Sequence, residues 1–285
     1  MDERAALSLV SDLVTAAGDD AAILDGFVFT IDMLHETTDF PSGTTRYTAG
    51  WRAVGASLSD VAAMGGEAIG TVAVYGAPTF EPEALSSFVE GAKAVSAAVD
   101  ADYVGGDLDQ HDEFTVATAA IGRIEEPIGR DGARPGDVAC VTGSLGRTAA
   151  AVRAFETGET AIGNELFRFQ PRIHAARQMG GRATASMDSS DGLARSLHQL
   201  AEASEVGFAI DGDSIPIADE LLAREPAETV LDVALGFGED FELVCTLDPA
   251  DVEAVTDDLD VPLSVIGQVT DAAEGITIDG RPLTD

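Results

Sequence analysis

Apolar and polar positions follow two different spacings along the first 130 residues, which predicts a mixture of strands and helices. Strands are predicted at 27–32, 69–75, 103–104 and 114–124. Helices are predicted at 4–16, 48–64 and 81–99. Residues 33–47 show no periodicity and are expected to form a long loop. In the helix over 48–64 the apolar stripe leaves Asp60 on the opposite face, where a solvated acid is the simple interpretation.

The second half repeats this mixture after a segment rich in glycine, from Gly129 to Gly136. Strands are predicted at 137–142, 183–187, 206–210, 241–247 and 263–269. Helices are predicted at 147–157, 163–179 and 190–204. The fold class is therefore α/β or α+β, with two domains predicted at residues 1–130 and 131–285.

Acidic residues stand beside glycine in four turns that adjoin apolar runs. These turns are Gly18-Asp19-Asp20, Gly105-Gly106-Asp107, Asp188-Ser189-Ser190-Asp191-Gly192 and Gly238-Glu239-Asp240, and Asp32 ends a predicted strand. Carboxylates are hard ligands suited to Mg²⁺, and glycine lets backbone N–H groups approach phosphates. Taken alone, the first two turns are more typical of a helix cap or a tight turn. The segment 188–192 is a stronger signal, because capping does not require two carboxylates and two hydroxyls together. Together these segments indicate a metal-rich phosphate site built from distant parts of the chain.

The motifs exclude a standard P-loop NTPase and give no support to a dinucleotide-binding Rossmann site. The chain has no Gly-x-x-x-x-Gly-Lys-Ser/Thr loop, and no Gly-x-Gly-x-x-Gly follows a strand where a dinucleotide site requires it. The turn Gly143-Ser144-Leu145-Gly146 before a helix is compatible with an anion site and equally with a structural turn.

The net charge limits the possible binding partners, and the two cysteines indicate the cellular compartment. The net charge is −35, with a single lysine, Lys93, so nucleic acid and anionic membranes would be repelled. No apolar run is long enough to span a membrane, and the N-terminus lacks the pattern of a secretory signal. Cys140 and Cys245 lie in apolar runs as buried strand residues, which fits a reducing cytoplasm.

Read in order, the motifs resemble the thiamine-monophosphate kinase family. The matching strings include Gly-Asp-Asp-Ala-Ala-Ile-Leu at 18–24, Thr-Ile-Asp-Met-Leu at 30–34, Ser-Met-Asp-Ser-Ser-Asp-Gly-Leu at 186–193 and Gly-Glu-Asp-Phe-Glu-Leu at 238–243. Further matches lie at 50–66, 105–107, 129–137 and 141–146. The resemblance implies the two-domain aminoimidazole-ribotide-synthetase-like fold and a homodimer joined through the N-terminal sheet. It also implies transfer of the ATP γ-phosphoryl group to thiamine monophosphate, yielding thiamine diphosphate, with several Mg²⁺ ions.

The same resemblance assigns site residues position by position. Magnesium ligands are expected at Asp20, Thr30, Asp32, Asp60, Asp107, Asp188 and Asp191, and Asp32, Asp60 and Asp107 are expected around the transferring group. Nucleotide contacts are expected at Gly106, Arg130 and Ser190. Substrate contacts are expected at Asp39 and Glu239.

Three departures from the family pattern bear on these assignments. Ile31 replaces a hydroxyl residue that is a metal ligand in many members, and Asp39 replaces a frequent histidine, where an acid would face the cationic thiazolium. The chain ends at Asp285, before the tail in which many members place an aromatic residue near the substrate. Another residue is expected to cover the thiamine rings, or stacking is weaker.

Two other functions stay open from the residues alone. One is another ATP-dependent member of the superfamily, such as a purine-pathway synthetase that forms an amidine. The other is a non-catalytic acidic protein whose aspartates bind divalent cations without turnover.

The charge also predicts dependence on salt. Because 51 acidic and only 16 basic residues repel one another across the surface, we expect a halophilic source and a melting midpoint that rises between low and molar KCl. Differential scanning calorimetry across a KCl series measures this, and a midpoint that stays level would contradict the halophilic interpretation.

Overall fold

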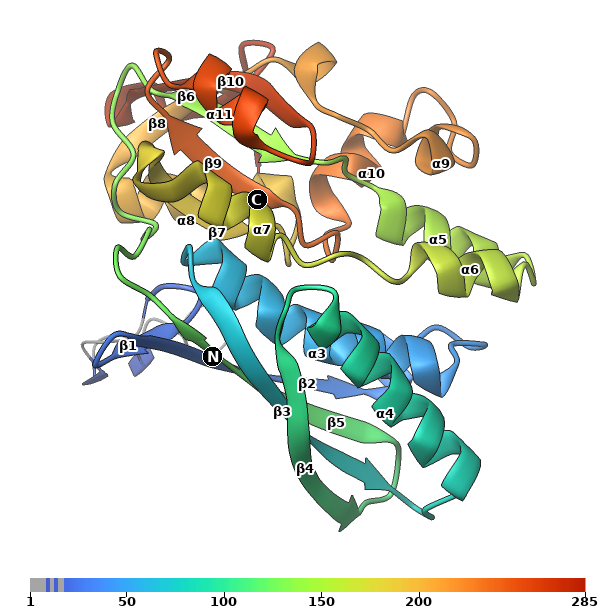
Figure 1. The fold of residues 1–285 in the computed structure, drawn as a ribbon. Coiled ribbons are helices and arrows are strands. Elements are labelled where there is room, and N and C mark those ends of the chain that lie inside the picture. Colours follow the sequence, from blue (N-terminus) through green and yellow to red (C-terminus); the bar gives the residue numbers. More distant parts are fainter. Residues whose placement is uncertain (1–8, 11–12, 15–17, 285) are drawn as a thin grey trace.

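The computed structural model describes residues 9–10, 13–14 and 18–284. The predicted helix over 4–16 lies largely outside these residues. The described chain forms two mixed layers, each a sheet with its own helices (Figure 1). None of the described helices combines the length and apolarity needed to cross a bilayer. The predicted α/β class is confirmed.

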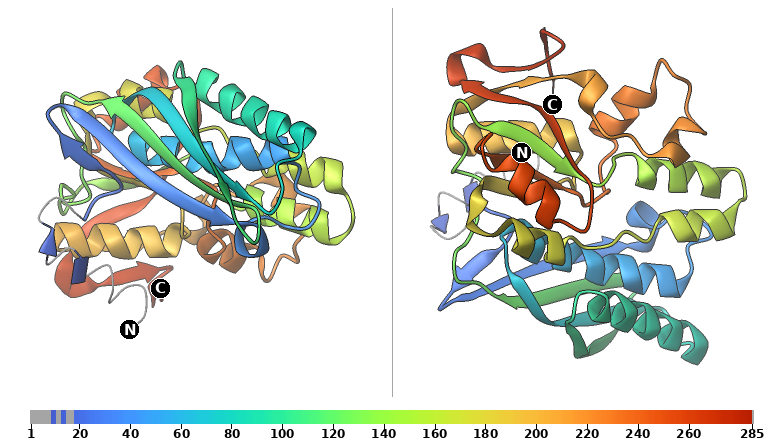
Figure 2. Two further views of the ribbon diagram at one scale, coloured as in Figure 1. Left: turned by 90° about the horizontal axis from the view of Figure 1, so that it is seen from below. Right: turned by 45° about the horizontal axis from the view of Figure 1, so that its top comes forward.

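The N-terminal sheet has five strands in the order β1-β2-β5-β3-β4. Their bounds are β1 Ala22–Leu24, β2 Phe27–His35, β3 Glu67–Ala77, β4 Asp102–Gln110 and β5 Thr115–Arg123. β3 and β4 pair in parallel, and the other neighbours are antiparallel. Helices α3 (Arg46–Ala63) and α4 (Pro82–Ala97) cover the face toward the C-terminal half, after the one-turn helix α2 (Glu36–Asp39). In the described part of the chain no helix covers the opposite face (Figure 2, left).

Close packing of α3 on α4 depends on two glycines. A Cβ at Gly50 would lie 2.1 Å from the carbonyl oxygen of Phe88, and one at Gly91 would lie 2.0 Å from that of Tyr47. Only glycine lets the two backbones approach so closely. On its other sides α3 also contacts β7 and α7 of the C-terminal half, so this helix lies between the two layers.

The C-terminal sheet has seven strands in the order β12-β11-β8-β10-β6-β9-β7. The strands are β6 Val138–Thr142, β7 Ala183–Asp188, β8 Val206–Ile210, β9 Leu243–Leu247, β10 Leu263–Asp271, β11 Ile276–Ile278 and β12 Arg281–Pro282. The helices are α5 Arg147–Glu156, α6 Thr160–Leu166, α7 Ile173–Met179, α8 Leu193–Ser204, α9 Asp219–Leu222, α10 Val230–Gly236 and α11 Val252–Asp258. Short 3₁₀ turns occupy 180–182, 212–214 and 272–274.

Residues 124–137 connect the two sheets. The domain division at residue 130 falls within this connection and stays a prediction. Cys140 on β6 and Cys245 on β9 are paired in register on adjacent strands, and both are fully buried. The prediction of buried strand cysteines is therefore confirmed.

Three local predictions are wrong. The loop predicted from residue 33 begins later, because β2 pairs with β5 as far as His35 opposite Thr115 and then turns into α2. The helix predicted at 163–179 is interrupted between α6 and α7. Gly105-Gly106-Asp107 does not form a turn after a strand but lies inside β4, where the register shifts and Gly105 has φ +139°. Sequence spacing alone does not reveal such long-range pairing.

Candidate active site

Three aspartates from distant segments meet between the two layers. Asp20 precedes β1, Asp60 lies in the last turn of α3, and Asp188 ends β7. One carboxylate oxygen from each lies within 4.8 Å of the others. The carboxylate of Asp60 therefore points into a shared cluster, and the interpretation of a solvated helical acid is wrong.

Burial makes this arrangement electrostatically unfavourable without a cation. Asp188 is fully buried, and burial together with the charge of Asp20 raises the pKa of its carboxyl to about 7. Burial and the charges of Asp188 and Asp32 raise the pKa of Asp60 well above its ordinary value. Like charges gathered in a region poor in water favour protonation or a bound cation.

Arg130 supplies one cation from the protein itself. Its Nη2 donates to Asp20 Oδ1 at 2.7 Å and its Nε to Asp20 Oδ2 at 3.1 Å, while its backbone N–H donates to Asp19. A planar guanidinium matches both carboxylate oxygens in this way. The predicted nucleotide contact is thus an internal partner of a predicted metal ligand.

Hydroxyl groups donate hydrogen bonds to the carboxylates of Asp60 and Asp32. Thr30 Oγ1 donates to Asp60 Oδ2 at 2.5 Å, and Ser57 Oγ donates to Asp32 Oδ2 at 2.7 Å. Ser57 also contacts Thr118 Oγ1 at 2.7 Å. Thr30 and Asp32 share the inner face of β2 because successive strand residues alternate between faces. Burial raises the pKa of Asp32.

Asp188 Oδ2 and Ser59 Oγ are buried and make no hydrogen bond of ordinary geometry with the described residues, although Ser59 lies close enough to Asp188 to lower the pKa of its carboxyl. Buried polar atoms are normally paired, so buried oxygens without such a bond beside three carboxylates are available as ligands for a cation. The donor set contains oxygen alone, which fits the preference of Mg²⁺.

The loops that follow β7 and precede β9 lie side by side. Ser190 O accepts from Glu239 N at 2.6 Å, and Ser189 exchanges hydrogen bonds with the backbone of Glu242. Gly238 fits beside Ser190 because a Cβ there would lie 2.6 Å from its carbonyl oxygen. The predicted substrate contact Glu239 is thereby linked to Ser190, two residues beyond Asp188.

Each acid of the Gly238–Glu242 segment has a partner of its own within the chain. Arg52 Nη2 donates to Glu239 Oε2 at 2.6 Å, and Arg172 Nε donates to Glu242 Oε2 at 2.6 Å. Asp240 accepts from the backbone N–H groups of Gly146 and Thr148 at the start of α5. Two arginines and two backbone N–H groups thus offset the repulsion among these three neighbouring acids.

Arg52, Arg172 and Ser57 are not among the site residues predicted from the sequence. A signal existed for Arg52, the one charged residue among the apolar positions of the predicted helix before Asp60. Arg52 is 1% exposed, its guanidinium lies 3.8 Å from the ring centroid of Phe167, and it donates to the Phe167 carbonyl. Its cationic group therefore fixes the segment around Glu239 from the N-terminal half.

Several predicted residues lie outside the cluster. Asp107 is exposed on β4 and is paired in register with Val74, whose side chain is on the outward face of the sheet. Asp191 is also exposed. Gly106 meets a structural need, because a Cβ there would lie 1.7 Å from the carbonyl oxygen of Ala73. Asp39 Oδ2 accepts from His35 N and Thr38 Oγ1, which stabilises the α2 turn.

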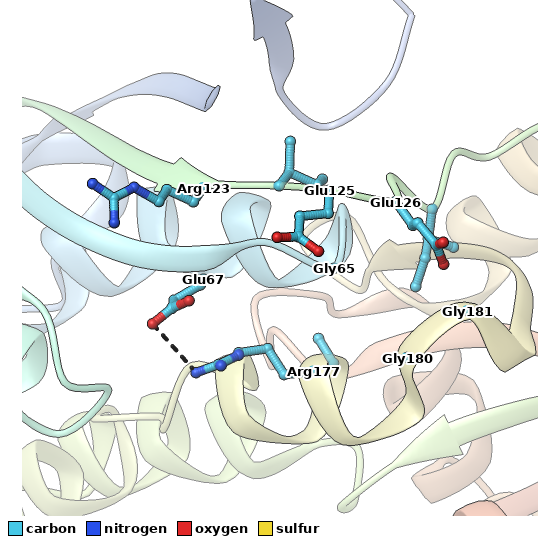
Figure 3. A pocket seen from close by; sticks show the side chains of 11 residues that line it. Gly65, Glu67, Arg123, Glu125, Glu126, Arg177, Gly180 and Gly181 are labelled. Atoms are coloured by element: carbon cyan, nitrogen blue, oxygen red, sulfur yellow. Dashed lines mark ion pairs between the residues drawn. The ribbon is translucent and has the colours of Figure 1, made fainter. Parts of the chain in front are cut away.

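Two cavities are lined by residues of both the N-terminal and the C-terminal layer. One of about 540 Å³ is lined by α2, the following loop, α5, Phe167, Phe237 and Glu239, and it includes Asp39. The other, of about 380 Å³, lies between the ends of β3 and β5 and helix α7 (Figure 3). Arg177 pairs with Glu67 across it at 3.6 Å, and its lining includes none of the predicted site residues.

Fold and site together define a class of protein. Residues 18–124 match the AIR synthase related protein N-terminal domain, and residues 134–279 match the corresponding C-terminal domain. A thiamine-monophosphate kinase of Halobacterium salinarum is 58% identical over 287 residues, covering 100% of this chain and 98% of the relative. That of Methanospirillum hungatei is 38% identical, covering 99% and 97%. The chain belongs to the thiamine-monophosphate kinase family, whose members are enzymes.

The solved structures agree with this assignment. A structure described as AaThiL complexed with AMPPCP and TMP superposes with a TM-score of 0.89 at 26% identity, covering 99% of this chain and 95% of that one. The predicted two-domain fold of the aminoimidazole-ribotide-synthetase-like superfamily is thereby confirmed.

The buried cluster predicts a pH-dependent stability of the metal-free protein. Because the pKa of Asp188 rises to about 7 in the folded state, its stabilising contribution is complete only below the unfolded value and is lost as pH rises through 7. In chelator at pH 8, Asp188→Asn should be more stable than the wild type by roughly 2–4 kcal/mol. Urea unfolding from pH 8 toward pH 4 should show this difference shrinking.

The exposed residue Asp257 on α11 gives a matched control, and Asp257→Asn should behave like the wild type at every pH. Added Mg²⁺ should stabilise the wild type and the control but not Asp188→Asn. Equal unfolding curves for wild type and Asp188→Asn at pH 8 would contradict the electrostatic account of the cluster.

Proposed function

We propose that the protein transfers the γ-phosphoryl group of ATP to thiamine monophosphate, giving thiamine diphosphate and ADP. Membership of the thiamine-monophosphate kinase family supports this activity. The observation that carries it is the meeting of Asp20, Asp60 and Asp188 within 4.8 Å. A separate cavity is lined by Asp39 and Glu239. Such a carboxylate cluster suits cations that accompany phosphates, and the cavity suits a cationic acceptor.

We propose that several Mg²⁺ ions bind to Asp20, Asp32, Asp60 and Asp188, with Thr30 and Asp191 at their edge. When bound, these ions would neutralise the phosphates of both substrates. The buried oxygens Asp188 Oδ2 and Ser59 Oγ support this assignment. Asp107 would contribute only where bound nucleotide or a second protomer extends the site toward β4, since it lies on the outward face.

The chain's own residues would then align the two substrates and neutralise their phosphate charges. Arg130, now paired with Asp20, is placed to move to a nucleotide phosphate, with Gly106 and Ser190 as further nucleotide contacts. The acceptor phosphate oxygen is already anionic, so no general base is needed. That oxygen forms the new bond to Pγ as the bond from Pγ to the β–γ bridging oxygen breaks, and ADP leaves with its electron pair. Direct in-line transfer follows, without a phosphoenzyme.

The activity is tested by incubating the protein with ATP, Mg²⁺ and thiamine monophosphate at high KCl and measuring thiamine diphosphate and ADP. Asp60→Asn should lower kcat by about 10²-fold or more, because it removes a charged ligand where transition-state charge develops. Asp257→Asn, on the exposed side of α11, is the matched control and should retain kcat.

Other outcomes separate the alternatives. ADP formed only with a purine precursor would identify an amidine-forming synthetase, and Mg²⁺ binding without any turnover would identify a cation-binding protein. Near-normal turnover of Asp60→Asn at saturating Mg²⁺ would contradict the role of Asp60. We propose the cytoplasm as the compartment, because it supplies ATP and keeps cysteines such as Cys140 and Cys245 reduced.

We propose that two copies associate through the uncovered face of the N-terminal sheet. Alternate residues of β2 point outward on this face, and Phe29, Ile31 and Met33 are 42%, 79% and 59% exposed. Neighbouring strands add further exposed apolar side chains on this face, namely Val72, Val74, Val104 and Ile121. A contiguous apolar patch of this kind is typical of a protein interface.

The dimer predicts that Ile31→Glu will separate the protomers, because it places a charge at the most exposed apolar position of this face. Light scattering coupled to size-exclusion chromatography should give twice the 29.4 kDa chain mass for the wild type and once that mass for the variant. Ile162→Glu, at an isoleucine 42% exposed on α6, should remain dimeric. A monomeric wild type would overturn the proposal.

A further inference from the structure

The cavity of about 540 Å³ has a chemistry distinct from the acid cluster. Among the described residues that line it are four phenylalanines, three carboxylates and three hydroxyl groups, and no arginine, lysine or histidine. The phenylalanines are Phe40, Phe155, Phe167 and Phe237. The carboxylates are Asp39, Glu156 and Glu239. Glu239 and Glu156 are paired with Arg52 and Arg153, which lie outside the lining. The lining itself presents carboxylates and an aromatic ring, which favour a planar cation over a phosphate.

One of the four phenylalanines is accessible. Phe40, Phe155 and Phe167 are 8%, 7% and 1% exposed, since they belong to the hydrophobic core. Phe237 is 39% exposed although it lines the same cavity. It caps the C-terminal end of α10, where its N–H donates to Val233 O at 3.0 Å, so a helix end fixes its backbone. An exposed aromatic ring with a fixed backbone offers a surface for stacking.

The carboxylate of Glu239 is fixed beside this ring. Arg52 is buried and donates to both Glu239 Oε2 and the Glu239 carbonyl oxygen. Glu239 adopts φ +59°, a conformation that a non-glycine residue rarely takes without such restraint. Its side chain is 40% exposed, so the charge is available to a ligand in the cavity.

A series of hydrogen bonds links the cavity residue Glu239 to Asp188 of the acid cluster. Glu239 N donates to Ser190 O, and Ser190 N contacts Asp188 Oδ1 at 3.3 Å. Arg52 and Asp60 stand eight positions apart on α3, which at 1.5 Å per residue is about 12 Å along the helix. The same helix therefore carries the arginine that holds Glu239 and one acid of the cluster.

We propose that Phe237 stacks on the cationic heteroaromatic part of the acceptor and that Glu239, positioned by Arg52, faces its positive charge. Phe237 thereby determines specificity for a ring-bearing cationic monophosphate. This inference rests on the proposed function, because it assigns the end of thiamine monophosphate that is remote from the reacting phosphate.

Kinetics with thiamine monophosphate and ATP test the role of Phe237. Phe237→Ala should raise the KM for thiamine monophosphate about tenfold while leaving the KM for ATP and kcat within about twofold, because the ring touches only the acceptor. Phe237→Trp should restore the KM. Phe80→Ala is the matched control, since Phe80 is 42% exposed and lies outside the cavity, and it should match the wild type.

Failure of this inference can be told apart from failure of the proposed function. Turnover by the wild type with an unchanged KM in Phe237→Ala would overturn the stacking role alone. A change in kcat or in both KM values that tryptophan does not rescue would indicate a structural role and also overturn it. Should the wild type show no turnover, calorimetric titration with thiamine monophosphate decides: a tenfold weaker Kd in Phe237→Ala supports the contact, and equal affinity or no binding refutes it.

Discussion

Burial of several like charges at one place is the constraint on which the rest of this structure depends. Asp20, Asp60 and Asp188 meet where the two layers close, and burial raises the pKa of each carboxyl. The protein offers Arg130 to one of them and leaves an oxygen of Asp188 without a hydrogen bond of ordinary geometry among the described residues. A fold that tolerates this unfavourable charge in its metal-free form is arranged for a cationic ligand, because the cation removes both repulsion and desolvation.

Helix α3 gives this arrangement its geometry. The helix lies between the N-terminal sheet and the C-terminal half, and the close contacts at Gly50 and Gly91 fix it against α4. Asp60 near its C-terminal end joins the acid cluster, and Arg52 two turns earlier fixes Glu239. One helix therefore carries both an acid of the cluster and the arginine that holds Glu239, so it sets the separation between them. A rigid support matters because phosphoryl transfer depends mainly on alignment.

The charges at the two places are compensated differently. Around Glu239 the carboxylates have arginines or backbone N–H groups as partners, and the surrounding cavity adds aromatic faces. At the acid cluster the partners are mostly hydroxyl groups, which hold carboxylates in position without neutralising them. The first environment suits an organic cation and the second suits metal ions with phosphates.

The sequence by itself determined the class of fold, the order of most strands and helices, and the oxygen-rich chemistry of the site, since periodicity and the glycine–acid motifs are local signals. Only the tertiary structure decided which acids meet. It brought Asp20, Asp60 and Asp188 together but placed Asp107 on the outward face of β4, since a bulge and the register with β3 set that orientation. It likewise placed Phe237 and Glu239 in the lining of one cavity, with Arg52 buried behind Glu239, because these positions depend on packing between segments far apart in the chain.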